Sequence, residues 1–243
     1  MTRSLFVFCI GVVVGFINGF AGGAAILSFP AMIAIGLNPV SAAMTNALGV
    51  WVANIGALHG KFREAKLIIL NEKRLISYSI FGALFGGLSL ALIPLNSFQK
   101  LIPILIAVSS LSLIYKQGNK LKLISIKFEN LLLSVVGFYA GYFGPGQGIM
   151  TIAILARNTK RSLIDINIRK NIIVSLTCVG PNIIYLASGK VNLYLALILS
   201  CGSVIGGYFG GKVIGRFDPQ KYRLGIFVIG ISTSIWFALK YWS

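Results

Sequence analysis

Apolar residues occupy long uninterrupted runs along this chain, and the charged residues gather in short segments between them. Asp, Glu, Lys and Arg are absent from the stretches 4–58, 75–99, 101–115, 130–156, 171–189, 191–211 and 224–239. A helix needs about 20 residues to cross a bilayer, and most of these stretches reach that length with their flanking residues. The pattern therefore predicts an all-α polytopic membrane protein in which residues 1–243 form a single transmembrane domain.

Composition supports this class. Of the 243 residues, 56% are hydrophobic and only 11% are charged, which is too apolar for a soluble domain of this length. The formal net charge is +17, but the basic residues are dispersed through short loops. This dispersion favours contact with anionic lipid headgroups and argues against a nucleic-acid partner. A signal peptide within residues 1–25 is an alternative, although the apolar pattern continues to Leu58 without the start of a mature domain.

Loop charges predict the orientation, because Lys and Arg accumulate in cytoplasmic loops. Of the 22 basic residues, 18 lie in the loops 59–74, 116–127, 157–170 and 212–223. If these four loops are cytoplasmic and both termini are outside, segment 129–156 must begin and end on the same side. We therefore expect a re-entrant hairpin that turns at 144–148, with limbs that reach the midplane. A single tilted span, with loop 157–170 outside, is the alternative.

Two glycine-rich segments resemble each other, GFINGFAGGAAI at 15–26 and GFYAGYFGPGQGI at 137–149. Each is followed by an amide-bearing apolar segment, a Gly-Lys turn and a segment with a Gly-Gly pair. The first would turn near Gly22-Gly23 and enter from the outside. One hairpin and three crossing helices per half would make 1–117 and 128–243 inverted repeats, a recurrent plan of secondary transporters. Chance similarity between glycine-rich helices is the alternative.

The glycine turns predict a binding site. The second limb of each hairpin begins at such a turn, so the N-terminus of its helix would point into the membrane centre. Unpaired amides there attract oxyanions without a basic side chain. Two opposed ends would form a neutral-walled midplane site for a small anion. The predicted substrate-binding residues are Asn18, Gly22, Gly23, Thr45, Asn46, Asn54, Gly144, Gly146, Gln147, Gly148, Lys170, Asn171 and Asn182.

Two features of this set have simpler explanations as well. An ordinary interhelical hydrogen bond would account for any one of the asparagines alone. Arg169 and Lys170 are the basic residues best placed to attract an anion from the cytoplasm, but both could simply mark a cytoplasmic loop.

Other chemistries lack the residues that they need. The acidic residues all lie in or beside loops, outside the membrane interior: Glu64, Glu72, Glu129, Asp165 and Asp218. None can serve as an intramembrane proton relay or cation ligand. The spacing of the three cysteines suits neither a metal site nor a disulfide framework: Cys9, Cys178 and Cys201. We expect no cofactor, no metal and no enzymatic activity, with a Ser–His pair at His59 as the alternative.

With these motifs the chain resembles the sulfite exporter TauE/SafE family of bacterial membrane proteins. The matching residues are the first glycine motif with Pro30 and the pair Thr45-Asn46, the second motif GFYAGYFGPGQGIMTIAIL, and the turn and helix SGKVNLYLALILSCGSVIGGYFGGKV. The resemblance covers essentially the whole chain. It implies a multi-pass protein of the bacterial inner membrane that exports sulfite or organosulfonates such as sulfoacetate, as a single chain or a homodimer.

The chain also departs from the family pattern. Relatives often have further glycines in place of Ala24 and Ala25, an acid in place of Asn18 and Ala140, and Lys in place of Ala47. The missing acids put proton coupling through them in doubt, and the changed first motif leaves the substrate open. The sequence thus predicts a passive or weakly coupled exporter of small anions. A sodium-coupled importer of a small solute and a non-transporting membrane scaffold are the alternatives.

Overall fold

The computed structural model describes residues 2–114, 125–157, 161–214, 216 and 219–242. Within these ranges the secondary structure is helical and contains no strand. The helices are α1 (Thr2–Phe20), α2 (Ala25–Ala34), α3 (Pro39–Ala57), α4 (Phe62–Asn71), α5 (Lys73–Leu92), α6 (Leu95–Ile114), α7 (Ile126–Tyr142), α8 (Gln147–Leu155), α9 (Leu163–Thr177), α10 (Val179–Ala187), α11 (Leu193–Lys212) and α12 (Pro219–Trp242).

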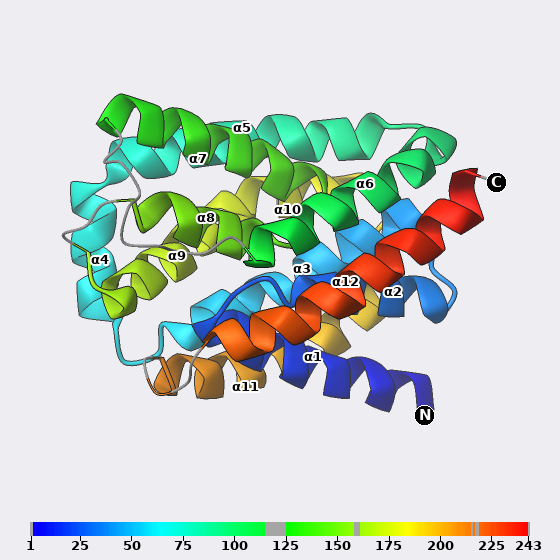
Figure 1. The fold of residues 1–243 in the computed structure, drawn as a ribbon, viewed down its shortest axis with the longest axis horizontal. Helices are drawn as coiled ribbons and strands as arrows, with labels where there is room; N and C mark the ends of the chain where they lie inside the picture. Colours follow the sequence, from blue (N-terminus) through cyan, green and yellow to red (C-terminus); the bar gives the residue numbers. More distant parts are fainter. Residues whose placement is uncertain (1, 115–124, 158–160, 215, 217–218, 243) are drawn as a thin grey trace.

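Seven segments of the described chain are long and apolar enough to cross a membrane, which confirms the all-α polytopic class. They are α1, α3, α5, α6, α11, the pair α9–α10, and residues Tyr222–Trp242 of α12. The long helices run roughly along the longest axis of the molecule, as Figure 1 shows. Both ends of the described chain lie at one end of this bundle, and α4 crosses its opposite end.

Two helical hairpins open at opposite ends of the bundle (Figure 1). α1 starts at the end that holds the termini, and α2 turns back towards it, whereas α7 starts at the α4 end and α8 returns there. The chain reverses at Gly22 and Gly23, with φ of 78° and 85°, and at Gly144 and Gly146, with φ of 90° and 89°. These conformations favour glycine because they disfavour a Cβ. The inverted-repeat relation of 1–117 and 128–243 stays a prediction, and most of loop 116–127 lies outside the described residues.

Two details differ from the sequence prediction. The first limbs are longer than half of a membrane-spanning helix, because α1 has 19 residues and α7 has 17, or roughly 28 and 25 Å of helix. Only α2 and α8, with ten and nine residues, are short. The apolar segment 171–187 is also not one helix, since it breaks at Cys178 between α9 and α10. Pro181 explains the break, because proline has no N–H to continue the helical hydrogen bonds.

Consecutive glycines let α5 and α11 each pack against two neighbouring helices at close range. The glycines and the residues that they face are Gly86 with Phe138 and Gly87 with Pro181 for α5, and Gly206 with Val12 and Gly207 with Ala53 for α11. A Cβ at these positions would press on neighbouring backbone atoms. The Gly-Gly pairs thus bring α5 against α7 and α10, and α11 against α1 and α3.

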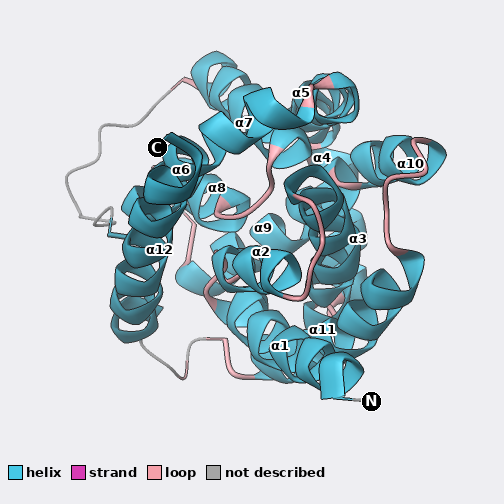
Figure 2. Cartoon of the chain, turned by 90° about the vertical axis from the view of Figure 1, so that its right-hand side faces the viewer, coloured by secondary structure: helices cyan, strands magenta, loops and turns pink. Residues whose placement is uncertain are grey.

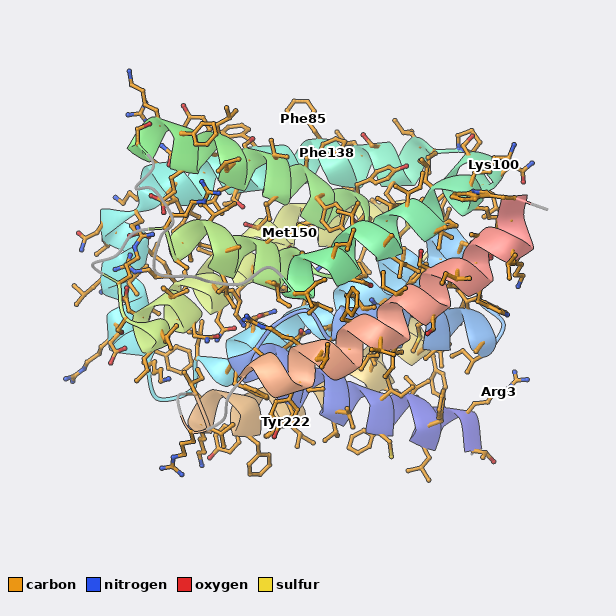
Figure 3. All side chains as sticks on the ribbon, viewed as in Figure 1. Arg3, Phe85, Lys100, Phe138, Met150 and Tyr222 are labelled. Atoms are coloured by element: carbon orange, nitrogen blue, oxygen red, sulfur yellow. The ribbon has the colours of Figure 1, made fainter. Side chains whose placement is uncertain are left out.

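Helices α2, α8 and α9 lie inside the bundle, and apolar side chains cover its outside. Viewed from one end in Figure 2, α2, α8 and α9 lie in the centre, surrounded by the longer helices. The side chains of Phe85 and Phe138 point outwards in Figure 3, with exposed fractions of 64% and 43%. Arg3 and Lys100 lie at the end that holds the termini. An apolar outer face of this kind suits contact with lipid, and it leaves the polar groups of the centre to the protein itself.

The predicted orientation can be tested by cysteine labelling in a background in which the three native cysteines are replaced by alanine. Ser162 is the N-cap of α9, and Lys190 follows the end of α10; both residues are exposed. The start of α9 and the end of α10 lie at opposite ends of the bundle (Figure 1). We expect a membrane-impermeant maleimide to label Lys190→Cys in intact cells, and Ser162→Cys only after the cytoplasmic face is opened. Labelling of Ser162→Cys from the outside would contradict the second re-entrant hairpin.

The glycine packing can be tested by thermal unfolding in detergent. Gly86→Ala would place a Cβ against the carbonyl oxygen of Phe138 in α7. Overpacking of this kind costs about 1–3 kcal/mol, so we expect a lower unfolding temperature. Gly225→Ala in α12 is the matched control, because no atom lies within 4 Å of the added Cβ. An equal shift for both variants would show that close packing of α5 on α7 is not the cause.

Candidate functional site

The tips of the two hairpins meet in the centre of the bundle. A Cβ added at Gly148 would lie 3.5 Å from the Cα atom of Gly22. A cavity lies beside this contact, with a volume of about 580 Å³ including its mouth. Most of the residues predicted from the sequence line it, namely Asn18, Gly22, Gly23, Asn46, Asn54, Gly144, Gly146, Gln147, Gly148, Lys170 and Asn182.

Thr45 and Asn171 are the predicted residues that do not line this cavity. Both are fully buried. The Thr45 hydroxyl accepts a hydrogen bond from the backbone N–H of Asn192 at 3.0 Å, which ties α3 to the start of α11. Asn171 donates from Nδ2 to the carbonyl oxygen of Gly19 at 3.3 Å. Neither side chain is part of the cavity wall, but each forms a hydrogen bond that joins a wall-forming helix to another segment of the chain.

Lys170 brings a positive charge into the wall of the cavity. Its side chain is buried, with 1% of the residue exposed. The ammonium group donates to the carbonyl oxygen of Asn18 and to Oδ1 of Asn171, both at 2.6 Å. Asn18 lies in the last turn of α1, where unpaired carbonyls carry partial negative charge. An ammonium group has three protons to donate, so one is left for a ligand in the cavity.

This charge corrects the prediction of a neutral wall. No carboxylate lines the cavity, and no ion pair of Lys170 is found in the part of the chain that the structure describes. Arg169, predicted to share its role, instead pairs with Glu72 and, at 2.8 Å, with Asp165. Neighbouring residues of a helix point about 100° apart, which explains why only one of the two faces the cavity.

Three of the four described acids form ion pairs, at the α4 end of the bundle. Glu129 in the first turn of α7 pairs with Arg161 at 2.6 Å, and Arg161 also reaches Glu72 at 3.4 Å. Together with Arg169 and Asp165, these residues form an ion-pair cluster that joins the start of α5, the second hairpin and α9. Across the described ranges, no three His, Cys, Asp or Glu side chains are grouped as a metal site would require.

Helix ends add partial charge to the cavity. α8 follows Gly146 and α2 follows Ala24, and neither helix has a side-chain N-cap. The N–H groups of Gln147 and Ile149 already donate to the carbonyl oxygens of Gly144 and Gly146, both at 3.1 Å, so the partial positive charge comes from the dipole of each helix. Asn18 Oδ1 accepts from the N–H of Ala24 at 2.9 Å and thereby fixes the turn between α1 and α2.

Two asparagines of the cavity wall have side-chain amide atoms without a hydrogen-bond partner among the described residues. Asn46 and Asn182 are 2% and 3% exposed. Within the described residues, neither Oδ1 nor Nδ2 of Asn182 forms a hydrogen bond, and neither does Oδ1 of Asn46. A buried polar group left in this state costs about 1–3 kcal/mol, so native structures usually provide a partner. A ligand or water in the cavity would supply one.

The sequence prediction missed the apolar part of the wall and one thiol. Cys178 was not among the predicted site residues, yet it lines the cavity and its Sγ lies 3.4 Å from Nε2 of Gln147. Residues four positions apart contribute to the same wall: Lys170, Val174, Cys178 and Asn182 from α9–α10, and Asn46, Val50 and Asn54 from α3. This helical spacing was the available signal.

Comparison with known proteins agrees with this architecture. Residues 7–237 match the family model described as sulfite exporter TauE/SafE. A probable membrane transporter protein of Haemophilus influenzae is 25% identical, over 85% of this chain and 83% of the relative. The probable membrane transporter protein YfcA of Escherichia coli K12 is 22% identical, over 91% and 84%. A probable membrane transporter protein of Methanocaldococcus jannaschii, MJ0441, is 25% identical, over 72% and 71%. No solved structure gives a significant match.

The family match covers nearly the whole chain, well beyond the two glycine motifs that suggested it. Together with the seven candidate spans and the bacterial relatives, it makes the chain a multi-pass bacterial membrane protein. This chain belongs to the sulfite exporter TauE/SafE family of membrane transporters.

Proposed function

We propose that this transporter carries small anions, and that it exports sulfite or an organosulfonate such as sulfoacetate. The observation that carries the proposal is the buried ammonium group of Lys170, which lines the cavity without a carboxylate partner among the described residues. The eleven predicted residues that line the cavity would contact the substrate at successive points along its path. Thr45 and Asn171 would hold that wall in position.

The charge balance of the site favours an anionic ligand. A buried ammonium group is stable only when its charge is compensated, and a site within the membrane offers little water to do so. The carbonyl oxygen of Asn18 and the amide oxygen of Asn171 provide two neutral acceptors. An oxyanion would add the missing negative charge, and the partial positive charge at the start of α8 would also attract it.

Export of an anion needs no coupling ion. At a membrane potential of about 100 mV, inside negative, each exported negative charge gains roughly 2.3 kcal/mol, which corresponds to nearly 50-fold in concentration ratio. No carboxylate of the described chain lines the cavity, so coupling through an intramembrane acid has no residue there.

Flux measurements separate this function from its alternatives. Purified protein in proteoliposomes would be loaded with labelled sulfite or sulfoacetate, with imposed gradients of potential or sodium. We expect the efflux rate to rise as the inside becomes more negative and to be independent of the sodium gradient. Uptake that follows a sodium gradient would favour the importer, and the absence of any flux would favour the scaffold.

Lys170→Gln tests the residue on which the proposal depends. A hydrogen bond to a charged group contributes about 1.5–3 kcal/mol, so we expect affinity for sulfoacetate to fall roughly 10- to 100-fold. Lys190→Gln is the matched control, because Lys190 is exposed, lies outside the cavity and donates to the carbonyl oxygen of Ala91 at 2.7 Å. Unchanged affinity in a stable Lys170→Gln variant would contradict the proposed anion site.

A further inference from the structure

The cavity has polar groups at two levels, and the register of its walls separates them. α3 and α9–α10 run in opposite directions. A hydrogen bond from Nε1 of Trp51 to the carbonyl oxygen of Ser175, at 2.7 Å, places these two residues side by side. Asn54 and Lys170 lie on the α4 side of this bond. Asn46 and Asn182 lie on the other side, towards the end that holds the termini.

These two levels are too far apart for one small anion. Lys170 and Asn182 are twelve residues apart along α9–α10, which is at most about 18 Å at 1.5 Å per residue, since the chain breaks at Cys178. Asn46 and Asn54 are eight residues apart along α3, or about 12 Å. The cavity wall between them includes the apolar side chain of Val174. A three-oxygen anion with one or two carbons is much shorter than either separation.

The second level is polar, buried and uncharged. Asn46 and Asn182 line the same cavity as Lys170 and are almost completely buried. Both amide atoms of Asn182 and Oδ1 of Asn46 have no partner within the described chain. The unpartnered Nδ2 group of Asn182 can donate two hydrogen bonds to an oxyanion, but an amide holds the anion less strongly than an ammonium group does.

We propose that Asn46 and Asn182 form a second anion station, which takes the anion from Lys170 and releases it towards the outside. This inference rests on the proposed function. An anion held only by Lys170 would have to cross the apolar part of the wall in one step. A neutral station beyond that part divides the step, and its weaker hold allows release, since conduction requires sites that bind without trapping.

The test compares equilibrium binding with flux for the same variants. Asn182→Leu and Asn46→Leu remove the amide and keep the side chain at nearly the same size. We expect sulfoacetate to bind these variants within about twofold of the wild type, and its initial efflux rate from proteoliposomes to fall about tenfold or more, as loss of a hydrogen bond to a charged group implies. Asn71→Leu is the control, because Asn71 is exposed at the end of α4. We expect the affinity and the efflux rate of this variant to equal those of the wild type.

Each outcome has a defined meaning. If Asn182→Leu weakens sulfoacetate binding as much as Lys170→Gln does, the cavity holds one site instead of two, and the inference is overturned. Unchanged efflux would show that the amides hold only water, and would also overturn it. If the wild type neither binds nor exports sulfoacetate or sulfite, the proposed function itself is wrong. Asn182→Ala replaces Asn182→Leu if the larger side chain lowers the unfolding temperature, and the same reduced efflux with retained binding is then expected.

Discussion

Backbone groups at the two broken helices need partners inside the membrane, and the rest of the structure depends on how they are supplied. A carbonyl left unpaired in lipid costs several kcal/mol. At the first break, Lys170 of α9 donates to the carbonyl oxygen of Asn18. At the second break, the hydroxyl of Ser109 in α6 donates to the carbonyl oxygen of Pro145 at 2.8 Å. Each half of the chain therefore supplies partners for the break in the other half, and the cavity forms where the two halves meet.

Lys170 combines this structural role with the proposed chemistry. The hydrogen bond to the end of α1 fixes the ammonium group beside the hairpin tips, and the partial negative charge there compensates it only in part. The positive charge of Lys170 that remains uncompensated would attract an anion. The ion-pair cluster around Glu72 has the complementary effect, because it keeps the described acids of that region engaged at the α4 end and away from the cavity. The site is thus positive for two reasons. Lys170 donates to a backbone carbonyl group instead of pairing with a carboxylate. The acids of the ion-pair cluster pair with arginines at the α4 end.

Much of this arrangement could be predicted from the sequence, because periodicity and glycine placement are local signals. These signals predicted the helical class, the two turns and half of the residues that line the cavity. The direction of Lys170 could not be predicted, since it depends on the rotation of α9 against the end of α1, a contact between residues 152 positions apart. The break at Cys178 was readable from Pro181 but was missed within a long apolar run. The lengths of α1 and α7 are set by packing on α11 and α5, for which sequence offers only the glycines.

The packing of α1 on α11 has a consequence for how the protein is made. Gly11 and Gly15 of α1 lie against the backbone of α11 near Ser203, and Ser4 bonds Tyr194 at 2.9 Å, 190 positions along the chain. During synthesis the first helix therefore enters the bilayer long before its packing partner exists. Its glycine face stays uncovered until α11 has been inserted, and contacts so distant in sequence form late. An amino-terminal fragment that ends before α11 would leave that face open to lipid, so assembly of the first half waits for the last quarter of the chain.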